Sequence, residues 1–207
     1  MPPHAIHLPD ELAERALGGS PVLDLTLLAD RERQSAEPGR PLLLLDKHGG
    51  VIGSAVADPE NEVIRILAKD PVDSFDLPFF RRRVSAAFKL RQALGLPGPD
   101  AAYRLIHGEG DELSGFAADV YGPFTVLYAY SKGLVPLGRL VATAIQEAVG
   151  SGGVVLKVRP KGGPKPGQAR QEVIGEEPPE KLIVRENEVP FEVHLLSGLN
   201  VGLFTDM

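Results

Sequence analysis

Four carboxylates lie close together between residues 109 and 119. They are Glu109, Asp111, Glu112 and Asp119, in the stretch GEGDELSGFAAD. Paired carboxylates can act as a general acid and a general base. The structural alternative is a turn between two strands, in which Asp111 bonds backbone amides and Asp119 pairs with Arg104. We favour the structural alternative, and Ser114 has no G-x-S-x-G context that would make it a hydrolase nucleophile.

Other catalytic chemistries find little support in the residues. The chain has no cysteine, which excludes disulfides, thiolate metal sites and a cysteine nucleophile. Its five histidines form no H-E-x-x-H arrangement, so no metal site is expected. The glycine cluster Gly150-Ser151-Gly152-Gly153 is expected to follow a helix and precede a strand, the reverse of a dinucleotide-binding loop. It therefore predicts a helix terminator.

Charge is distributed in blocks, although the net charge is −6. Residues 1–80 hold 7 Lys/Arg against 14 Asp/Glu, residues 81–170 hold 13 against 6, and residues 171–207 hold 2 against 8. A basic block on one surface attracts phosphate, whereas the alternative is a solvated loop with scattered surface charge. The candidate RNA-backbone contacts are Arg81, Arg82, Arg83, Lys89, Lys157, Arg159, Lys161 and Lys165.

The length of 207 residues predicts two small domains with aliphatic cores, since tryptophan is absent. No apolar run approaches the roughly 20 residues that span a bilayer, and the N-terminus has no signal-peptide core. We therefore expect a cytoplasmic protein with no membrane partner.

The first domain, residues 1–70, reads as a short helix over 9–17 followed by strands over 22–28, 42–46, 51–57 and 63–68. This spacing predicts a small β-barrel or sandwich. In the last strand, Ile64 and Ile66 alternate with Arg65 and Leu67, so we expect one face to be wet.

The second domain, residues 71–195, begins where the period changes to 3.6. Asp76 is the expected N-cap, Pro78 lies in the first turn and Gly95 ends the helix. The apolar stripe of this helix is Phe80, Val84, Ala87, Phe88, Arg91 and Leu94. Strands follow over 103–107, 116–120 and 124–130, then a helix over 134–149 and strands over 154–159, 181–186 and 191–195. The predicted class is α+β, with strand pairs flanking a helix.

Several segments carry a resemblance to a known family, among them VDSFDLPFFRRRVSAAFKLRQAL, which looks like its linker helix. PGRPLLLLDKHGGVIGSAVADPENEVIRILAKD resembles the PUA-like barrel that opens one family of class I S-adenosylmethionine (SAM)-dependent 23S ribosomal RNA cytosine-C5 methyltransferases, and YRLIHGEGDELSGFAADVYG is similar to its YRL…EgDgLpGl.vDrYg signature. The matching residues are Tyr103, Arg104, Leu105, Glu109, Asp111, Leu113, Gly115, Asp119, Tyr121 and Gly122. Ser114 and Val120 depart from the signature. The resemblance covers about residues 38–207.

The resemblance also implies what lies beyond the chain. FEVHLLSGLNVGLFTDM looks like the segment that precedes the catalytic domain, usually GqKTGfflDqR, so residues 196–207 are expected to start a Rossmann-like methyltransferase domain that is missing here. Phe204 and Asp206 would lie near the SAM site of the intact protein. The resembled family uses a cysteine thiolate for C5 methylation, so this chain alone is expected to bind no cofactor and to be inactive.

The leading hypothesis is therefore the RNA-recognition portion of a ribosomal RNA methyltransferase, partnered by ribosomal RNA and by its own catalytic domain. A stand-alone RNA-binding adaptor is the second hypothesis. A protein-interaction module whose partner covers the apolar tail 201–204 is the third. Homodimer formation is left open.

Overall fold

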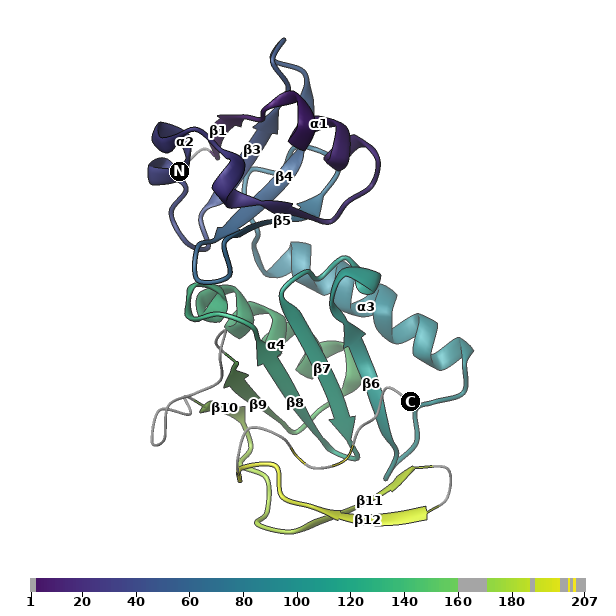
Figure 1. The fold of residues 1–207 in the computed structure, drawn as a ribbon. Coiled ribbons are helices and arrows are strands. Elements are labelled where there is room, and N and C mark those ends of the chain that lie inside the picture. Colours follow the sequence, from purple (N-terminus) through teal and green to yellow (C-terminus); the bar gives the residue numbers. More distant parts are fainter. Residues whose placement is uncertain (1–2, 160–170, 187–188, 198–200, 202, 204–207) are drawn as a thin grey trace.

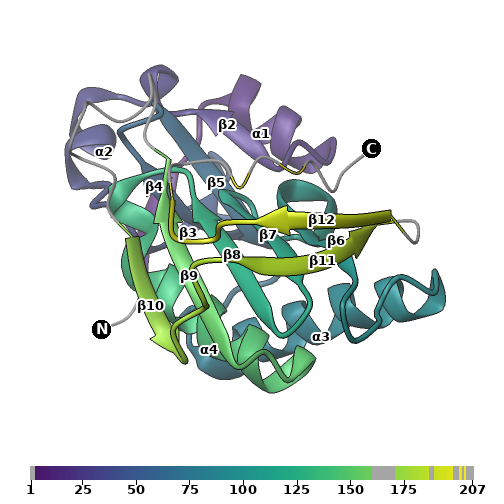
Figure 2. The same cartoon turned by 90° about the horizontal axis from the view of Figure 1, so that it is seen from below.

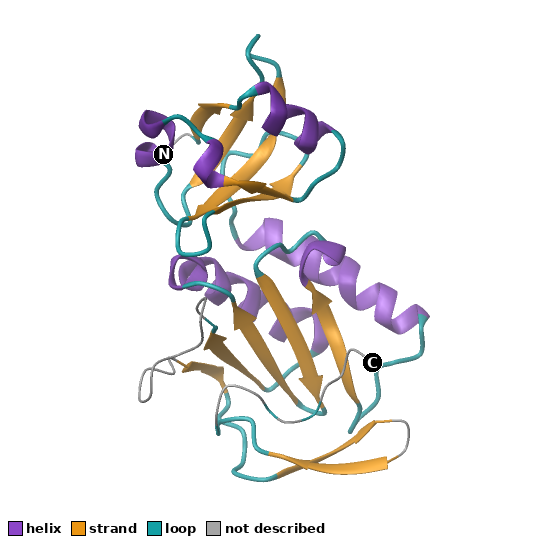
Figure 3. Cartoon of the chain, in the orientation of Figure 1, coloured by secondary structure: helices purple, strands orange, loops and turns teal. Residues whose placement is uncertain are grey.

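The computed structural model describes residues 3–159, 171–186, 189–197, 201 and 203. Figure 1 shows two lobes, one above the other, joined after the last strand of the first lobe. We call residues 3–70 the N-terminal lobe and residues 71–197 the central lobe. Each lobe is built around a five-stranded sheet, and the described part of the chain mixes helices and strands throughout (Figure 3). The α+β class is confirmed.

The N-terminal lobe has a five-stranded sheet in the order β1-β3-β4-β5-β2. Its elements are β1 (His4–His7), α1 (Asp10–Leu17), β2 (Val22–Asp24), α2 (Asp30–Ser35), β3 (Pro41–Leu45), β4 (Val51–Asp58) and β5 (Val63–Ala68). Pro9 and the acidic first turn begin α1, as predicted. The core lies between α1 and the sheet, around Ile6, Leu12, Leu44 and Ile64.

One expectation for this lobe needs correction, and two of its elements were not predicted. The predicted strand over 22–28 ends at Asp24, whose carboxylate accepts from the Thr26 amide at 2.8 Å and starts a 3₁₀ turn at Leu25–Leu27. Strand β1 and helix α2 were not predicted. No ladder joins β1 to β2 among the described residues, so the sheet is open in its pairing and the PUA-like barrel stays a prediction.

The expected wet face of β5 is also wrong. Arg65 is 8% exposed and Leu67 is 2% exposed. Leu67 and Val56 belong to the core of the central lobe, so this face is covered by the other lobe. An alternating strand shows which residues share a face, but it does not show what packs against that face.

The central lobe has a sheet in the order β10-β9-β8-β7-β6. Its elements are α3 (Leu77–Ala93), β6 (Ala102–His107), β7 (Phe116–Tyr121), β8 (Phe124–Ala129), α4 (Val135–Val149), β9 (Gly153–Val158) and β10 (Gln171–Gly175). Strands β8 and β9 are parallel because α4 carries the chain back across the sheet. The sequence predicted strand pairs flanking a helix. The structure instead has one continuous sheet with α3 and α4 on one face.

Helix α3 follows its sequence signals closely. The Asp76 carboxylate accepts from the Phe79 amide at 2.9 Å, and Pro78 lies in the first turn. Of the predicted stripe, Phe80, Val84, Ala87 and Arg91 are buried and Phe88 is partly buried. Leu94, directly after the helix, is 64% exposed.

The hairpin β11 (Leu182–Glu186) and β12 (Val189–Val193) lies on the other face of the central sheet, and Figure 2 shows it crossing that sheet. Val184, Val193 and Leu195 pack there against Tyr121 and Val126. Val201 and Leu203 of the apolar tail join the same core. Strand β10 was not predicted. In the described part of the chain, no helix combines the length and the apolar character needed to cross a membrane.

Candidate nucleic-acid interface

The acidic turn between β6 and β7 is built to hold the lobe together. Asp111 forms two ion-pair contacts with Arg91 of α3, Oδ1 to Nη1 at 2.5 Å and Oδ2 to Nη2 at 2.8 Å. It also accepts from the His107 amide at 2.6 Å. Asp119 pairs with Arg104 of β6. These contacts confirm the structural interpretation of both carboxylates, since each is held by a guanidinium group.

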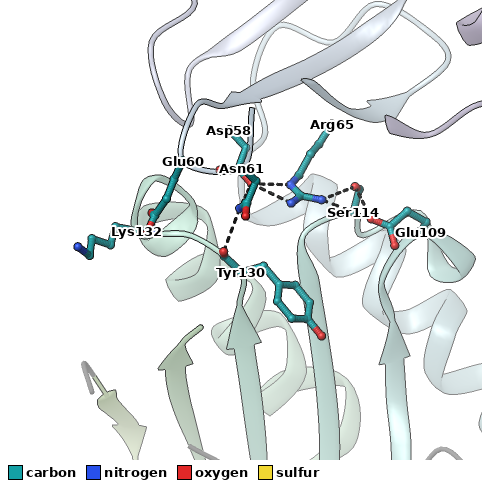
Figure 4. Close-up of polar contacts among 8 residues, drawn as sticks. All are labelled: Asp58, Glu60, Asn61, Arg65, Glu109, Ser114, Tyr130 and Lys132. Carbon is teal, nitrogen blue, oxygen red and sulfur yellow. Dashed lines mark hydrogen bonds and ion pairs between the residues drawn. The ribbon is translucent and has the colours of Figure 1, made fainter. Parts of the chain in front are cut away.

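Arg65 joins the two lobes through side-chain contacts (Figure 4). Its Nε donates to Oδ2 of the buried Asp58 at 2.8 Å within the N-terminal lobe. Its Nη1 reaches Ser114 Oγ at 3.4 Å and Glu109 Oε1 at 3.5 Å in the central lobe. Ser114 in turn donates to Glu109 at 2.8 Å. We call Asp58, Arg65, Glu109 and Ser114 the lobe clasp.

Two further hydrogen bonds cross the same junction. Asn61 Nδ2 donates to the Tyr130 carbonyl at 3.0 Å, and the Lys132 amide donates to Glu60 Oε2 at 2.9 Å (Figure 4). The turn β4–β5 is thereby tied to the end of β8. Gly115 makes the close approach feasible: its φ is +87°, and a Cβ there would lie 2.9 Å from Arg65 Cδ. The junction is therefore specified by side chains from both lobes.

The cations of α3 differ in what they contact. Arg81 pairs with the half-exposed Glu147 of α4 at 2.5 Å. Arg83 is half-buried: it donates to the Leu67 carbonyl at 3.1 Å, pairs with Glu112 and lies over the Phe79 ring at 5.4 Å. Burial lowers the pKa of the Arg83 guanidinium, which stays charged at neutral pH.

Arg82 and Lys89 are exposed, and neither forms an ion pair with another described residue. Such cations are the ones most readily available to a phosphate, because no carboxylate has to be displaced.

The two cations at the end of β9, Lys157 and Arg159, lie on the face of the sheet that carries the hairpin. Lys157 is 1% exposed, and it aligns with Tyr128 of β8, which belongs to the core beneath the hairpin. Burial lowers the pKa of Lys157 to about 8, with a smaller contribution from Arg159. Arg159 stacks over the Tyr128 ring at 4.3 Å. Lys161 and Lys165 lie outside the described residues, as do Phe204 and Asp206.

The predicted single cationic surface is therefore wrong for the described residues. The α3 cations belong to the helical side of the sheet, whereas Lys157 and Arg159 belong to the side that carries the hairpin. Lys157 is also too buried to reach a phosphate. Strand β9 is buried on both faces, so the Lys157 side chain lies inside the protein. A count of charges along the sequence does not show this burial.

A cleft of about 730 Å³ lies between the two lobes, with Arg82 and Arg83 among its lining residues. Lys69, which directly follows β5 in the N-terminal lobe, also lines this cleft. Neither Lys69 nor Arg65 was among the sequence-predicted site residues. The alternation of β5 could not have shown this, because a β-bulge interrupts the strand between Ile66 and Ala68 and Lys69 follows its end. Clusters of three or more potential metal ligands do not occur among the described residues.

No family model matches the chain. Ribosomal RNA large subunit methyltransferase I of Erwinia tasmaniensis is 31% identical over 176 residues, covering 83% of this chain and 44% of that protein. The proteins of the same name from Cronobacter sakazakii and Aliivibrio fischeri are each 29% identical, over 181 and 182 residues. The chain spans less than half the length of these relatives.

Solved structures show the same fold. A protein from Streptococcus mutans described as a SAM-dependent methyltransferase superposes with a TM-score of 0.79 at 19% identity, over 98% of this chain and 51% of that one. A methyltransferase complexed with SAH gives a TM-score of 0.80 at 19% identity. The chain is thus a sequence relative of large-subunit ribosomal RNA methyltransferases, and nearly all of it has the fold of about half of the Streptococcus mutans structure.

Proposed function

We propose that this chain is the RNA-recognition and substrate-positioning part of a SAM-dependent ribosomal RNA methyltransferase of the 5-methylcytosine type. The observation that carries the proposal is the sequence relationship to ribosomal RNA methyltransferases over 176 residues. The exposed cations Arg82 and Lys89 on α3 support it, because phosphate neutralisation supplies most of the sequence-independent affinity for RNA.

The cofactor belongs to the same proposal. One structural neighbour is complexed with SAH, so we propose SAM as the cofactor of the intact protein. The described residues do not fit it: Gly150, with φ of +75°, ends α4 and precedes β9, the reverse of the strand-glycine-helix order of a nucleotide loop. The alignments cover 44 to 46% of the relatives, and we place the cofactor-binding part in the remainder.

The 5-methylcytosine assignment has a chemical consequence for this chain. Methylation at C5 of a pyrimidine requires a nucleophile to add at C6, so that C5 becomes electron-rich. The 207 residues contain no cysteine for that task. We therefore propose that the chain positions RNA and that methyl transfer needs a catalytic part supplied in addition. Methyl transfer by the purified chain alone would contradict this.

Affinity for ribosomal RNA fragments, measured against salt concentration, tests the RNA-binding proposal. Each neutralised phosphate of a single strand contributes about −0.7 to the slope of log K against log salt, so three to five contacts give about −2 to −3.5. The double variant Arg82→Gln/Lys89→Gln should reduce the magnitude of the slope by about 1.4, since both side chains are exposed and lack ion pairs with described residues. A slope near zero for the parent protein would refute RNA binding.

A protein-interaction module is the second candidate, and one observation favours it. Leu90, Leu94 and Leu96, at the end of α3, are 52%, 64% and 42% exposed. An exposed apolar cluster of this kind is typical of a contact surface. Sedimentation of the chain, alone and with a separately expressed catalytic part, distinguishes a homodimer and a heterocomplex from a monomer. Binding to the catalytic part that is lost in Leu94→Gln but not in Arg82→Gln would support this role.

A further inference from the structure

The cleft between the lobes has walls contributed by both. One wall comes from the N-terminal lobe, including Ile52, Ile66 and Lys69. The other comes from α3 and the acidic turn, including Arg82 and Ala86. Its volume of about 730 Å³ lies within the range of about 300–1,000 Å³ that is typical of small-ligand sites. The space is therefore large enough for a nucleotide unit.

Three of the six charged side chains that line the cleft are already paired. Arg83 pairs with Glu112, and Glu109 accepts from Ser114 and Arg65. Lys69 and Arg82 are exposed and come from opposite walls, and neither is ion-paired to a described residue. These two cations can therefore meet a polyanion from both sides without first breaking an internal ion pair.

The remaining lining suits an RNA strand in particular. Ile52 and Ile66 are partly buried and offer an apolar wall on which a base can pack. Asp70 lines the cleft next to Lys69 and supplies an acceptor for a 2′-hydroxyl or a base amino group. A carboxylate in such a position is unfavourable for contact with phosphate alone. The mixture of two cations, an apolar wall and an acceptor favours an unpaired nucleotide over a duplex backbone.

The separation of the walls is fixed by the lobe clasp. Arg65 is 8% exposed and contacts Asp58 on one side and Ser114 and Glu109 on the other. Because Leu67 and Val56 also belong to the core of the central lobe, the walls are held by packing as well as by polar contacts. A groove with fixed walls loses little conformational freedom when a strand binds.

We propose that this cleft is the binding site for a single-stranded RNA segment, with Lys69 and Arg82 contacting phosphates from opposite walls. The inference rests on the proposed function and names the place where the RNA lies. It adds Lys69 of the N-terminal lobe as a contact residue.

The first test is the salt dependence of binding to a single-stranded oligoribonucleotide from large-subunit ribosomal RNA. Lys69→Gln and Arg82→Gln should each reduce the magnitude of the slope by about 0.7, and the double variant by about 1.4. Arg31→Gln is the matched control, because Arg31 is exposed, is not ion-paired to a described residue and does not line the cleft. It should leave the slope unchanged. All three side chains are exposed, so the variants should keep the parent's thermal unfolding midpoint.

A second test uses the absence of cysteine, since an introduced thiol is then the only one. Ala86→Cys places a thiol on the cleft wall, and Ala93→Cys places one on the exposed end of the same helix. Single-stranded RNA should slow alkylation at position 86 several-fold and leave position 93 unchanged, and duplex RNA should protect position 86 less.

The outcomes separate the two proposals. If the parent chain binds RNA with a steep salt slope, but Lys69→Gln and Arg82→Gln retain that slope and position 86 is not protected, the cleft inference is wrong and the proposed function stands. If the parent chain binds no RNA, both are wrong.

Discussion

Asp111→Asn is the sharpest test of the view that the acidic turn is structural. The side chains of Arg91 and Asp111 are 9% and 6% exposed, and two contacts of 2.5 and 2.8 Å join them. Asparagine has nearly the same volume as aspartate, so the change removes the charge without opening a cavity. Arg91 is then left as a buried cation without its carboxylate.

The magnitude follows from the surroundings of the pair. Removing one partner of a buried ion pair destabilises by about 3–5 kcal/mol. Arg91 keeps its bond to the Arg104 carbonyl at 3.0 Å, and asparagine still offers one acceptor oxygen, so we expect the lower end, about 3 kcal/mol. For a protein of this size that corresponds to a fall of about 6–12 °C in Tm.

Urea and thermal unfolding followed by circular dichroism measure this change, since the chain has no tryptophan for fluorescence. The control is Glu112→Gln in the same turn. Glu112 has a side chain that is 57% exposed and pairs with Arg83, so its loss should destabilise by less than about 1 kcal/mol. A stability of Asp111→Asn within about 0.5 kcal/mol of the parent would refute the structural role and reopen an acid-base interpretation.

Two further predictions concern Lys157 and Gly115. Because the pKa of Lys157 is about 8 in the folded protein and 10.5 in the unfolded chain, the unfolded state alone holds this proton between those values. The free energy of unfolding of the parent, relative to that of Lys157→Met, should therefore rise by about 3 kcal/mol from pH 8 to 10.5. Urea unfolding at a series of pH values measures this difference. The absence of such a rise would contradict the burial of Lys157. Gly115→Ala should destabilise by more than about 1 kcal/mol in the same assay, because the new Cβ would lie 2.6 Å from Leu134 Cδ1 and 2.9 Å from Arg65 Cδ. Gly49→Ala is its control, with φ of +83° and no atom within 4 Å; equal losses in the two variants would show that backbone strain, and not the lobe junction, accounts for the effect.

The sequence alone was sufficient wherever a local rule decides the structure. Asp76 and Pro78 start α3 because a carboxylate and a missing amide suit the first turn of any helix. Gly150 ends α4 because a left-handed residue is needed there. Two contacts of the acidic segment also followed from the sequence: Asp111 accepts from a nearby backbone amide in its turn, and Asp119 of β7 pairs with Arg104 on the neighbouring strand. The pairing of Asp111 with Arg91 of α3 did not.

Only the tertiary structure could decide what covers each face. Arg65 and Lys157 look like exposed strand cations in the sequence, yet one is buried by the second lobe and the other lies on the sheet face that carries the hairpin core. The cleft lined by Lys69 could not be predicted for the same reason, because it forms only where the two lobes meet. Periodicity records the direction of a side chain relative to its own strand or helix, and burial depends on segments that are distant in the sequence.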